Sequence, residues 1–199
     1  PTFKSHHGVC AKFMLLTGAR ITETTAATWS QIDLEAKTWT IPPENLKDTR
    51  ALQARRHKPK QALAIPLSRQ AIQLLTDAQQ AETERRQLNC LQEEIRKQDL
   101  LFVGPRGSRL GNWDRWLKAT TATTGITGWS AHALRRTTAT LAGDLGAPPH
   151  IVSVILGHSN VGGQLVAGYN HSTYGFEHRQ ILQGVADKLE VIEGSVTYG

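Results

Sequence analysis

Apolar residues recur at helical spacing in several stretches of the chain, with polar residues between them. The first stretch predicts a helix over about residues 8–17 that ends at Gly18, because glycine readily adopts the conformation that closes a helix. The last predicts a long helix over 176–191, with its apolar residues on one side. Further helices are expected from about residue 22, from the N-cap Ser68, around Trp113 and Trp116, and from the N-cap Ser130 to Gly157 in two pieces divided before Pro148.

Two short segments alternate between apolar and polar residues and contain β-prone side chains. Residues 38–41 and 61–67 are therefore predicted strands. They flank a basic, irregular stretch, residues 47–60, which we expect to form a long hairpin tip. The pattern as a whole is not an alternating strand–helix repeat. It predicts a mixed fold, mainly α with a small antiparallel β-sheet.

Size, charge and cysteine content narrow the class of protein. The chain has 199 residues, of which 39% are apolar, and this suits one domain with a core of ordinary size. Its net charge of +6 is compatible with a polyanionic partner such as nucleic acid. Cys10 and Cys90 have no partners at metal-ligand spacing and are too few for a disulfide framework, which favours reduced thiols in the cytoplasm. Because no membrane span or signal peptide is visible, no membrane partner is expected.

Three separated pieces of the chain carry residues suited to phosphate chemistry. The first is 17–23, which contains Arg20; the second runs from His132 to Arg135; the third is Leu156-Gly-His158, with Tyr169 eleven positions beyond that histidine. His132 and Arg135 lie three apart at the start of a predicted helix, so they share a face at an end that favours anions. Taken singly, the pieces also have ordinary structural explanations, such as a surface arginine or a helix cap.

The chain resembles the tyrosine recombinases, or phage integrases, in the order of its motifs. These are Thr-Gly-x-Arg-x-x-Glu, a hairpin that bears a lysine, His-x-x-Arg, Leu-Gly-His and then Tyr. The resemblance extends from about residue 10 to residue 190, and it is especially similar to integrases of prophages and genomic islands in 125–137, 65–68 and 169–174. It implies the tyrosine recombinase catalytic-domain fold over residues 1–191, followed by a C-terminal tail, 192–199. It also implies an N-terminal DNA-binding domain that is absent from this chain.

The family's motif implies a role for each matching residue. Arg20 and Arg135 would clamp the scissile phosphate, because guanidinium groups stay charged and present paired donors to phosphate oxygens. His132 and His158 would donate hydrogen bonds to the same phosphate, and His132 would also act as general base. Tyr169 would attack phosphorus and form a 3′-phosphotyrosine.

The remaining roles in the family's site fall to a lysine and an acid. Lys47 is our prediction for the hairpin lysine that protonates the leaving 5′-oxygen, and Lys58 and Lys60 are alternatives because the insertion in the hairpin is long. Glu23 would support the pocket by orienting an arginine, or would serve only as an acid at a helix N-terminus. Tyr174 is the close rival of the predicted nucleophile and resembles a second, non-catalytic tyrosine of these integrases.

The resemblance thus implies a site-specific DNA recombinase, an integrase that cleaves and rejoins DNA through a phosphotyrosine intermediate. Exchanging one phosphoester for another keeps the bond energy, so neither a nucleotide cofactor nor a metal is expected. The implied partners are double-stranded DNA at attachment sites and further copies of the protein in a homotetramer on that DNA. Basic residues of the predicted hairpin tip would contact DNA phosphates, namely Arg50, Arg55, Arg56, Lys58 and Lys60.

Three other activities remain open from the sequence. A type IB topoisomerase-like enzyme would use a similar pocket to nick and close one strand. A catalytically inactive DNA-binding module would keep the fold without the chemistry. A phosphohydrolase would use His132 or His158 as nucleophile, and this leaves Tyr169 and Arg20 without a role.

Overall fold

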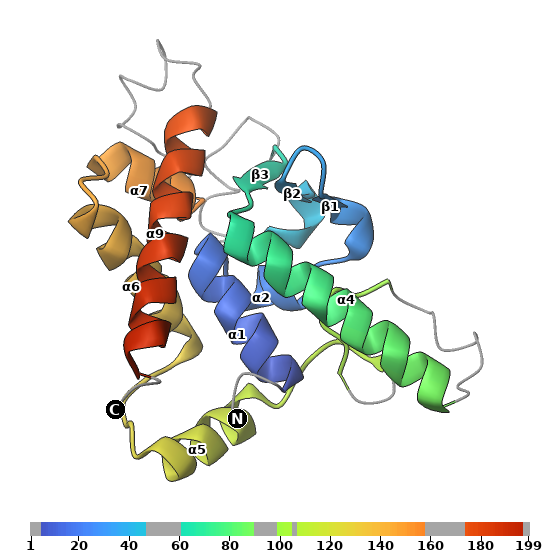
Figure 1. Cartoon of the computed structure of the whole chain (residues 1–199). Coiled ribbons are helices and arrows are strands. Elements are labelled where there is room, and N and C mark those ends of the chain that lie inside the picture. Colours follow the sequence, from blue (N-terminus) through green and yellow to red (C-terminus); the bar gives the residue numbers. More distant parts are fainter. Residues whose placement is uncertain (1–4, 47–60, 90–98, 105–106, 158–173, 197–199) are drawn as a thin grey trace, which may run out of the picture.

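The computed structural model describes residues 5–46, 61–89, 99–104, 107–157 and 174–196, and these form a body of helices with a small antiparallel sheet at one side (Figure 1). The predicted fold class, mainly α with a small antiparallel β-sheet, is confirmed. The helices are α1 (His6–Thr17), α2 (Ile21–Thr25), α4 (Arg69–Asn89), α5 (Trp113–Thr124), α6 (Ala131–Asp144), α7 (Pro149–Ile155) and α9 (Gly175–Val196). The strands are β1 (Ile32–Asp33), β2 (Thr38–Ile41) and β3 (Leu63–Pro66), and short 3₁₀ turns lie at Trp29–Gln31 and Pro43–Asn45.

Helix α1 occupies the centre of the molecule and contacts α4, α6 and α9 (Figure 1). It begins where Ser5 Oγ accepts a hydrogen bond of 3.1 Å from the Gly8 amide. It ends at Gly18, whose φ of +68° allows its own amide to donate to the Met14 carbonyl at 2.8 Å. Phe13 and Leu16 are fully buried. Because α1 is covered on several sides, few of its positions can be polar, and its sequence is accordingly apolar.

The sheet has the order β1-β2-β3, and both of its pairs are antiparallel. Trp39 lies opposite Ile65 across β2 and β3, and Ile41 lies opposite Leu63. Trp39 and Ile41 are buried while Thr40 between them is exposed, which is the period-two alternation that predicted β2 at its observed bounds. The structure adds β1, which was not predicted because two residues are too few to show a period.

One part of the core lies between the inner face of the sheet and the central helix, and the rest lies between that helix and the helices around it. The ring of Phe13 packs against Trp39 at a centroid distance of 5.3 Å and against Phe102 at 5.4 Å. Phe102 belongs to the apolar segment 100–102, which is buried. These contacts join α1 to the sheet and so fix the direction in which the chain leaves α1 at Gly18.

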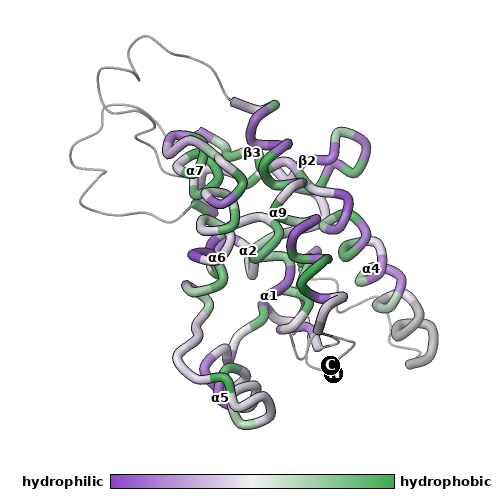
Figure 2. Tube along the Cα trace, turned by 60° about the vertical axis from the view of Figure 1, so that its left-hand side comes forward, coloured by the Kyte–Doolittle hydropathy of each residue, from purple (hydrophilic) through white to green (hydrophobic). Residues whose placement is uncertain are grey.

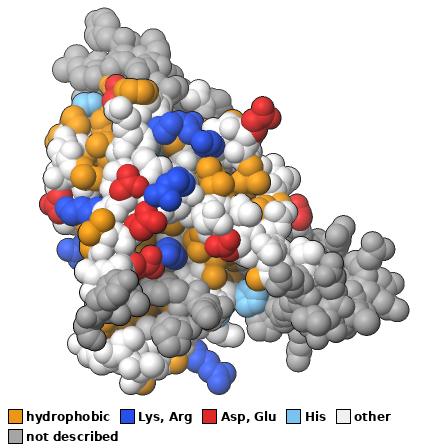
Figure 3. Space-filling model, viewed as in Figure 1, with side chains coloured by type: hydrophobic (Ala, Val, Ile, Leu, Met, Phe, Trp, Pro, Cys, Tyr) orange, Lys and Arg blue, Asp and Glu red, His pale blue; other side chains and the backbone are white. Residues whose placement is uncertain are grey.

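A polar seam joins α4 to α9 on the outside of the molecule, where Figure 3 shows side chains of both charges gathered. Gln70 Nε2 donates to Asp187 Oδ1 at 2.7 Å and to Glu190 Oε2 at 2.8 Å. Arg69 Nη2 also donates to Glu190, at 2.9 Å. The two hydrogen bonds and the nearby guanidinium hold the pKa of Glu190 below its usual value. Helix α9 is therefore held against α4 by polar contacts in addition to its buried face.

Helix α9 is longer than the sequence pattern indicated. The predicted end at Val191 was wrong, because the helix continues to Val196. Lys12 Nζ pairs with Glu193 Oε2 at 2.7 Å, so the last turns of α9 are held beside α1. Val191 and Ile192 are apolar but exposed, so they do not extend the buried stripe that gives a helix its apolar periodicity. The predicted boundary between a catalytic domain, 1–191, and a C-terminal tail, 192–199, stays a prediction.

Helix α5 stands apart from the other helices in both views of the molecule (Figures 1 and 2). None of its residues is fully buried. Trp113 and Trp116 pack against each other with ring centroids 5.5 Å apart, and His7 of α1 contacts both rings. His7 Nε2 also lies 2.7 Å from the Gly111 carbonyl oxygen. An aromatic cluster thus attaches α5 to the N-terminal end of α1.

Candidate active site

Three helices meet at Gly18, the residue that ends α1. A Cβ atom at Gly18 would lie 3.1 Å from Ile155 Cγ2 of α7 and 3.3 Å from Thr138 Cγ2 of α6. Glycine is therefore needed here both for its left-handed conformation and for the close approach. Thr138 Oγ1 donates to the Leu15 carbonyl at 2.9 Å and joins α6 to α1 at the same point. This packing brings together the ends of α1 and α7 and the middle of α6.

Arg20 lies two residues beyond that junction and is held by Glu23. Its Nη1 is 2.8 Å from Glu23 Oε1, and its backbone amide donates to Glu23 Oε2 at 2.8 Å. The side chain of Glu23 is 1% exposed, whereas that of Arg20 is 28% exposed. Glu23 thus contacts the guanidinium of Arg20 and, through the Arg20 amide, also caps the start of α2. The guanidinium of Arg20 keeps access to solvent while its direction is fixed.

Arg135 of α6 lies deeper, with only 7% of its surface exposed. Its Nη1 donates to the Gly18 carbonyl at 2.6 Å, and its Nη2 donates to the Leu156 carbonyl at the end of α7. Burial, and then the positive charge of Arg20, lower the pKa of Arg135 to about 10, while the charge of Glu23 acts in the opposite direction. Arg135 therefore stays protonated at neutral pH and joins α1 to α7 through two backbone carbonyls.

Gly157 completes the junction. It follows α7 with a φ of +56°, and a Cβ atom there would lie 2.8 Å from Leu63 Cδ2 and 3.9 Å from Arg20 Nη1. A side chain here would therefore collide with the side chain of Leu63 in β3, close to the guanidinium of Arg20. The glycine of the Leu-Gly-His piece thus has a steric reason as well as a conformational one.

The charges at this junction favour an anion. The charge of Arg20 lowers the pKa of Arg135, and among the described residues Glu23 is the acid whose charge opposes this effect. Two positive charges against one negative charge leave an excess of positive charge beside the exposed part of Arg20. An arginine pair with unused N–H donors is well suited to the oxygens of a phosphate group.

The model of the phage integrase family matches residues 2–175 of this chain. The chain belongs to the phage integrase family. The match spans all three pieces that carry the resemblance in the sequence, from Arg20 through Arg135 to Tyr169. No curated protein matches the chain.

Solved structures of phage integrase relatives share the fold. The Tn1549 transposon integrase in complex with transposon right end DNA is similar at a TM-score of 0.57 and 20% identity, over 84% of this chain and 55% of that chain. XerA recombinase is similar at a TM-score of 0.55 and 20% identity over the same shares. XerH site-specific recombinase bound to difH substrate is similar at 0.54 and 21% identity, over 81% of this chain and 42% of that chain. The chain thus spans about half the length of these structures.

The structure brings together part of the residue set that the phage integrase motif implies. Arg20, Glu23 and Arg135 meet at the junction described above. His132 is exposed in the first turn of α6, one turn before Arg135, and this turn begins at the cap where Ser130 Oγ accepts from the Ala133 amide at 3.2 Å. The other predicted site residues lie outside the described residues: Lys47, Arg50, Arg55, Arg56, Lys58, Lys60, His158 and Tyr169.

Several residues that hold the site were not singled out from the sequence. Thr138 bridges α6 to α1, and the carbonyl of Leu156 accepts a hydrogen bond from Arg135. Arg109 supports α2 through Nε, which donates to Thr25 Oγ1 at 3.1 Å, and through Nη2, which donates to the Thr22 carbonyl. Backbone carbonyls carry no sequence signal, and a threonine within a helix has none that separates it from a surface residue.

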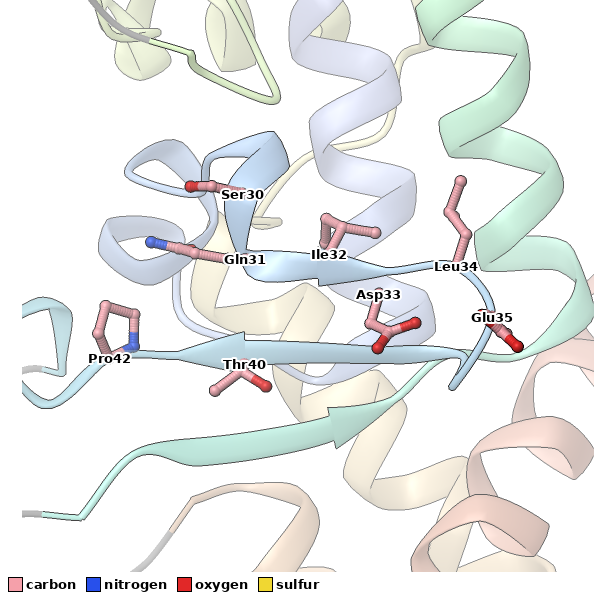
Figure 4. Close-up of a pocket in the computed structure, with 8 residues that line it drawn as sticks. All are labelled: Ser30, Gln31, Ile32, Asp33, Leu34, Glu35, Thr40 and Pro42. Atoms are coloured by element: carbon pink, nitrogen blue, oxygen red, sulfur yellow. The ribbon is translucent and has the colours of Figure 1, made fainter.

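A shallow hollow of about 670 Å³ lies elsewhere, over the outer side of β1 and β2 (Figure 4). It is lined by Ser30, Gln31, Ile32, Asp33, Leu34, Glu35, Thr40 and Pro42, so neither site arginine reaches it. Within the described ranges, no group of three His, Cys, Asp or Glu side chains is placed to hold a metal ion. In the same part of the chain, no helix is long and apolar enough to span a membrane.

Proposed function

We propose that this chain is the catalytic part of a site-specific DNA recombinase that cleaves and rejoins DNA through a 3′-phosphotyrosine intermediate. The observation that carries the proposal is the junction of Arg20, the N-cap residue of α2, with Arg135 of α6, where the buried carboxylate of Glu23 pairs with Arg20. Membership of the phage integrase family supports it further. The activity of a longer protein that contains this chain is part of the same proposal.

The arginine pair would bind the scissile phosphate. In the transition state phosphorus carries five oxygens and more negative charge than in the ground state, so fixed positive groups stabilise the transition state more. Arg135 is fixed by its two backbone contacts and Arg20 by Glu23, so little reorganisation is needed when charge develops. His132, one turn from Arg135, would add a further donor.

Tyr169 would supply the nucleophile. An ordinary tyrosine has a pKa of about 10, so attack at neutral pH needs a base, and His132 is our choice. The new bond joins the tyrosine oxygen to phosphorus, and the bond from phosphorus to the 5′-oxygen breaks. The 5′-oxygen takes a proton from a lysine, for which Lys47 is our choice and Lys58 and Lys60 are the alternatives. Reversal of these steps by another 5′-hydroxyl would rejoin the strand.

Double-stranded DNA is the proposed partner. The structures of the Tn1549 integrase and of XerH contain DNA, and this chain has a net charge of +6. The basic stretch with Arg50, Arg55, Arg56, Lys58 and Lys60 would contact phosphates, so affinity should fall as salt rises. Recombination joins strands from two duplexes, and we propose that a homotetramer in the cytoplasm performs it.

The proposal is tested by covalent capture of DNA. A library of nicked duplexes, cut from DNA that flanks the gene, is incubated with the wild type, with Tyr169→Phe and with Tyr174→Phe. The nick lets the cleaved end diffuse away, so an adduct accumulates and shifts on a denaturing gel. We expect adducts with the wild type and Tyr174→Phe and none with Tyr169→Phe.

Other outcomes would point to the alternative activities. An adduct that persists in Tyr169→Phe but is lost in Tyr174→Phe would move the nucleophile. Relaxation of a supercoiled plasmid that lacks any enriched sequence would favour a topoisomerase-like enzyme. Binding of the library without any adduct would favour an inactive DNA-binding module.

A further inference from the structure

Tyr174, the first described residue after the stretch that contains Tyr169, has an unusual backbone conformation. Its φ is +48°, a left-handed value that is unfavourable for a bulky side chain. Such conformations persist where surrounding contacts over-determine them, and they concentrate at functional positions. The Tyr174 carbonyl accepts a hydrogen bond of 2.9 Å from the His178 amide, so this residue also starts α9.

The contacts that hold Tyr174 come from α7. Its ring lies 5.0 Å from that of His150, centroid to centroid, with the two planes tilted by 53°. Both side chains are half-buried, and that of Tyr174 packs against the core. His150 is the second residue of α7, next to Pro149, which fixes the start of that helix. The aromatic pair thus joins the start of α9 to the start of α7.

The other end of α7 lies at the candidate active site. Leu156 accepts a hydrogen bond from Arg135, and Gly157 lies beside Arg20. With a rise of about 1.5 Å per residue, His150 and Leu156 are separated by about 9 Å along the helix axis. Tyr169 precedes Tyr174 by five residues, which can span at most about 17 Å. Five residues are therefore long enough to cover the axial length of α7 between its contact with Tyr174 and its end at the arginine pair.

We propose that Tyr174 and His150 are positioning residues: their ring contact anchors the chain to the start of α7 and so fixes where Tyr169 meets the phosphate bound by Arg20 and Arg135. This inference rests on the proposed function and adds a role for a tyrosine that the chemistry does not use. Small displacements of a reacting group cost large factors in rate, so a displaced anchor slows attack without weakening the contacts that bind DNA.

Rates and affinities of matched variants test the anchor. Tyr174→Ala and His150→Ala remove one ring each, Tyr174→Phe and His150→Phe keep a ring, and Phe176→Ala removes a neighbouring ring that is 70% exposed. The rate of adduct formation is measured in single turnover at saturating nicked DNA, beside the affinity for the same DNA. We expect both Ala variants, and the double Ala variant equally, to lose about tenfold or more in rate at unchanged affinity. The Phe variants and Phe176→Ala should keep the wild-type rate.

A second readout, hydrogen exchange of the His178 amide, does not depend on cleavage. The carbonyl that accepts from this amide belongs to Tyr174. Loss of the ring contact in Tyr174→Ala or His150→Ala should loosen residue 174, so exchange should be faster than in the wild type. Wild-type adduct rates in both Ala variants would overturn the proposal, as would a rate loss matched by an equal loss of affinity. If the wild type binds DNA but forms no adduct, the proposed function fails. The exchange rates then decide the anchor alone, and unchanged exchange in both Ala variants overturns it.

Discussion

His178 gives a stability prediction whose size can be worked from the structure. It lies on the inner face of α9 with 2% of its surface exposed, and its Nε2 atom is buried without a hydrogen-bond partner among the described residues. Burial, and then the positive charge of Arg179, lower the pKa of His178 from 6.5 to about 4. The unfolded chain therefore binds a proton at this side chain more readily than the folded protein does.

The direction of the pH dependence follows from that difference. Because the folded pKa is lower than the unfolded one, the contribution to stability is fully present above about pH 6.5 and is lost as the pH falls toward 4. The loss should be about 1 kcal/mol at pH 5.5 and about 2–3 kcal/mol at pH 4.5. These values are of the order of a quarter of the total stability of a typical domain.

Replacement of His178 by leucine isolates this effect from the titration of carboxylates. Urea unfolding of the wild type and of His178→Leu is followed at pH 7.5, 5.5 and 4.5, and the two curves of unfolding free energy against pH are subtracted. We expect the difference to change by the amounts above, with the wild type losing more. Parallel curves would refute the reasoning, because they would mean that the imidazole is protonated in the folded protein or reaches water.

Three further substitutions test the junction and the last helix. Arg135→Lys should slow adduct formation at least about 100-fold, because the single nitrogen of an ammonium lacks the wide planar fork by which Arg135 contacts two carbonyls and still faces a phosphate; a rate within tenfold of the wild type would count against the arginine pair. Gly157→Ala should lower the free energy of unfolding by about 1–3 kcal/mol, through its left-handed φ and through a collision with the side chain of Leu63. Adding Leu63→Ala should relieve that collision and leave the cost of the left-handed φ. An unchanged urea midpoint for Gly157→Ala would show that the chain does not pass close to β3. Lys12→Met should cost less than about 1 kcal/mol because its partner Glu193 is half exposed, and a larger loss in urea unfolding would mean that the pair is more buried than the structure has it.

The sequence predicted the local parts of this fold well because each has a local cause. Gly18 ends α1, and the caps Ser68 and Ser130 accept hydrogen bonds of 3.2 Å from the amides of Ala71 and Ala133. Strand β2 was placed at its observed bounds by its alternation. Strand β1 and the last turns of α9 were missed because two residues have no period and because an exposed helix end has no apolar pattern.

For the site, the sequence named the side chains but not what holds them. Arg20, Glu23 and Arg135 were predicted from their motif, and the structure brings them to one junction. The bridge from Arg135 to the Leu156 carbonyl and the passage of Gly157 beside Leu63 depend on how α6, α7 and β3 pack. Such contacts join residues far apart in the chain, so no local pattern carries them.

Mapping of the covalent bond to one residue tests the central claim most directly. Adducts formed by the wild type on a nicked duplex are digested with nuclease and protease, and the peptide that retains a nucleotide is sequenced by mass spectrometry. We predict a phosphodiester remnant on Tyr169, and its loss together with cleavage when Arg135 is replaced. A remnant on Tyr174, or on a histidine such as His132, would contradict the account.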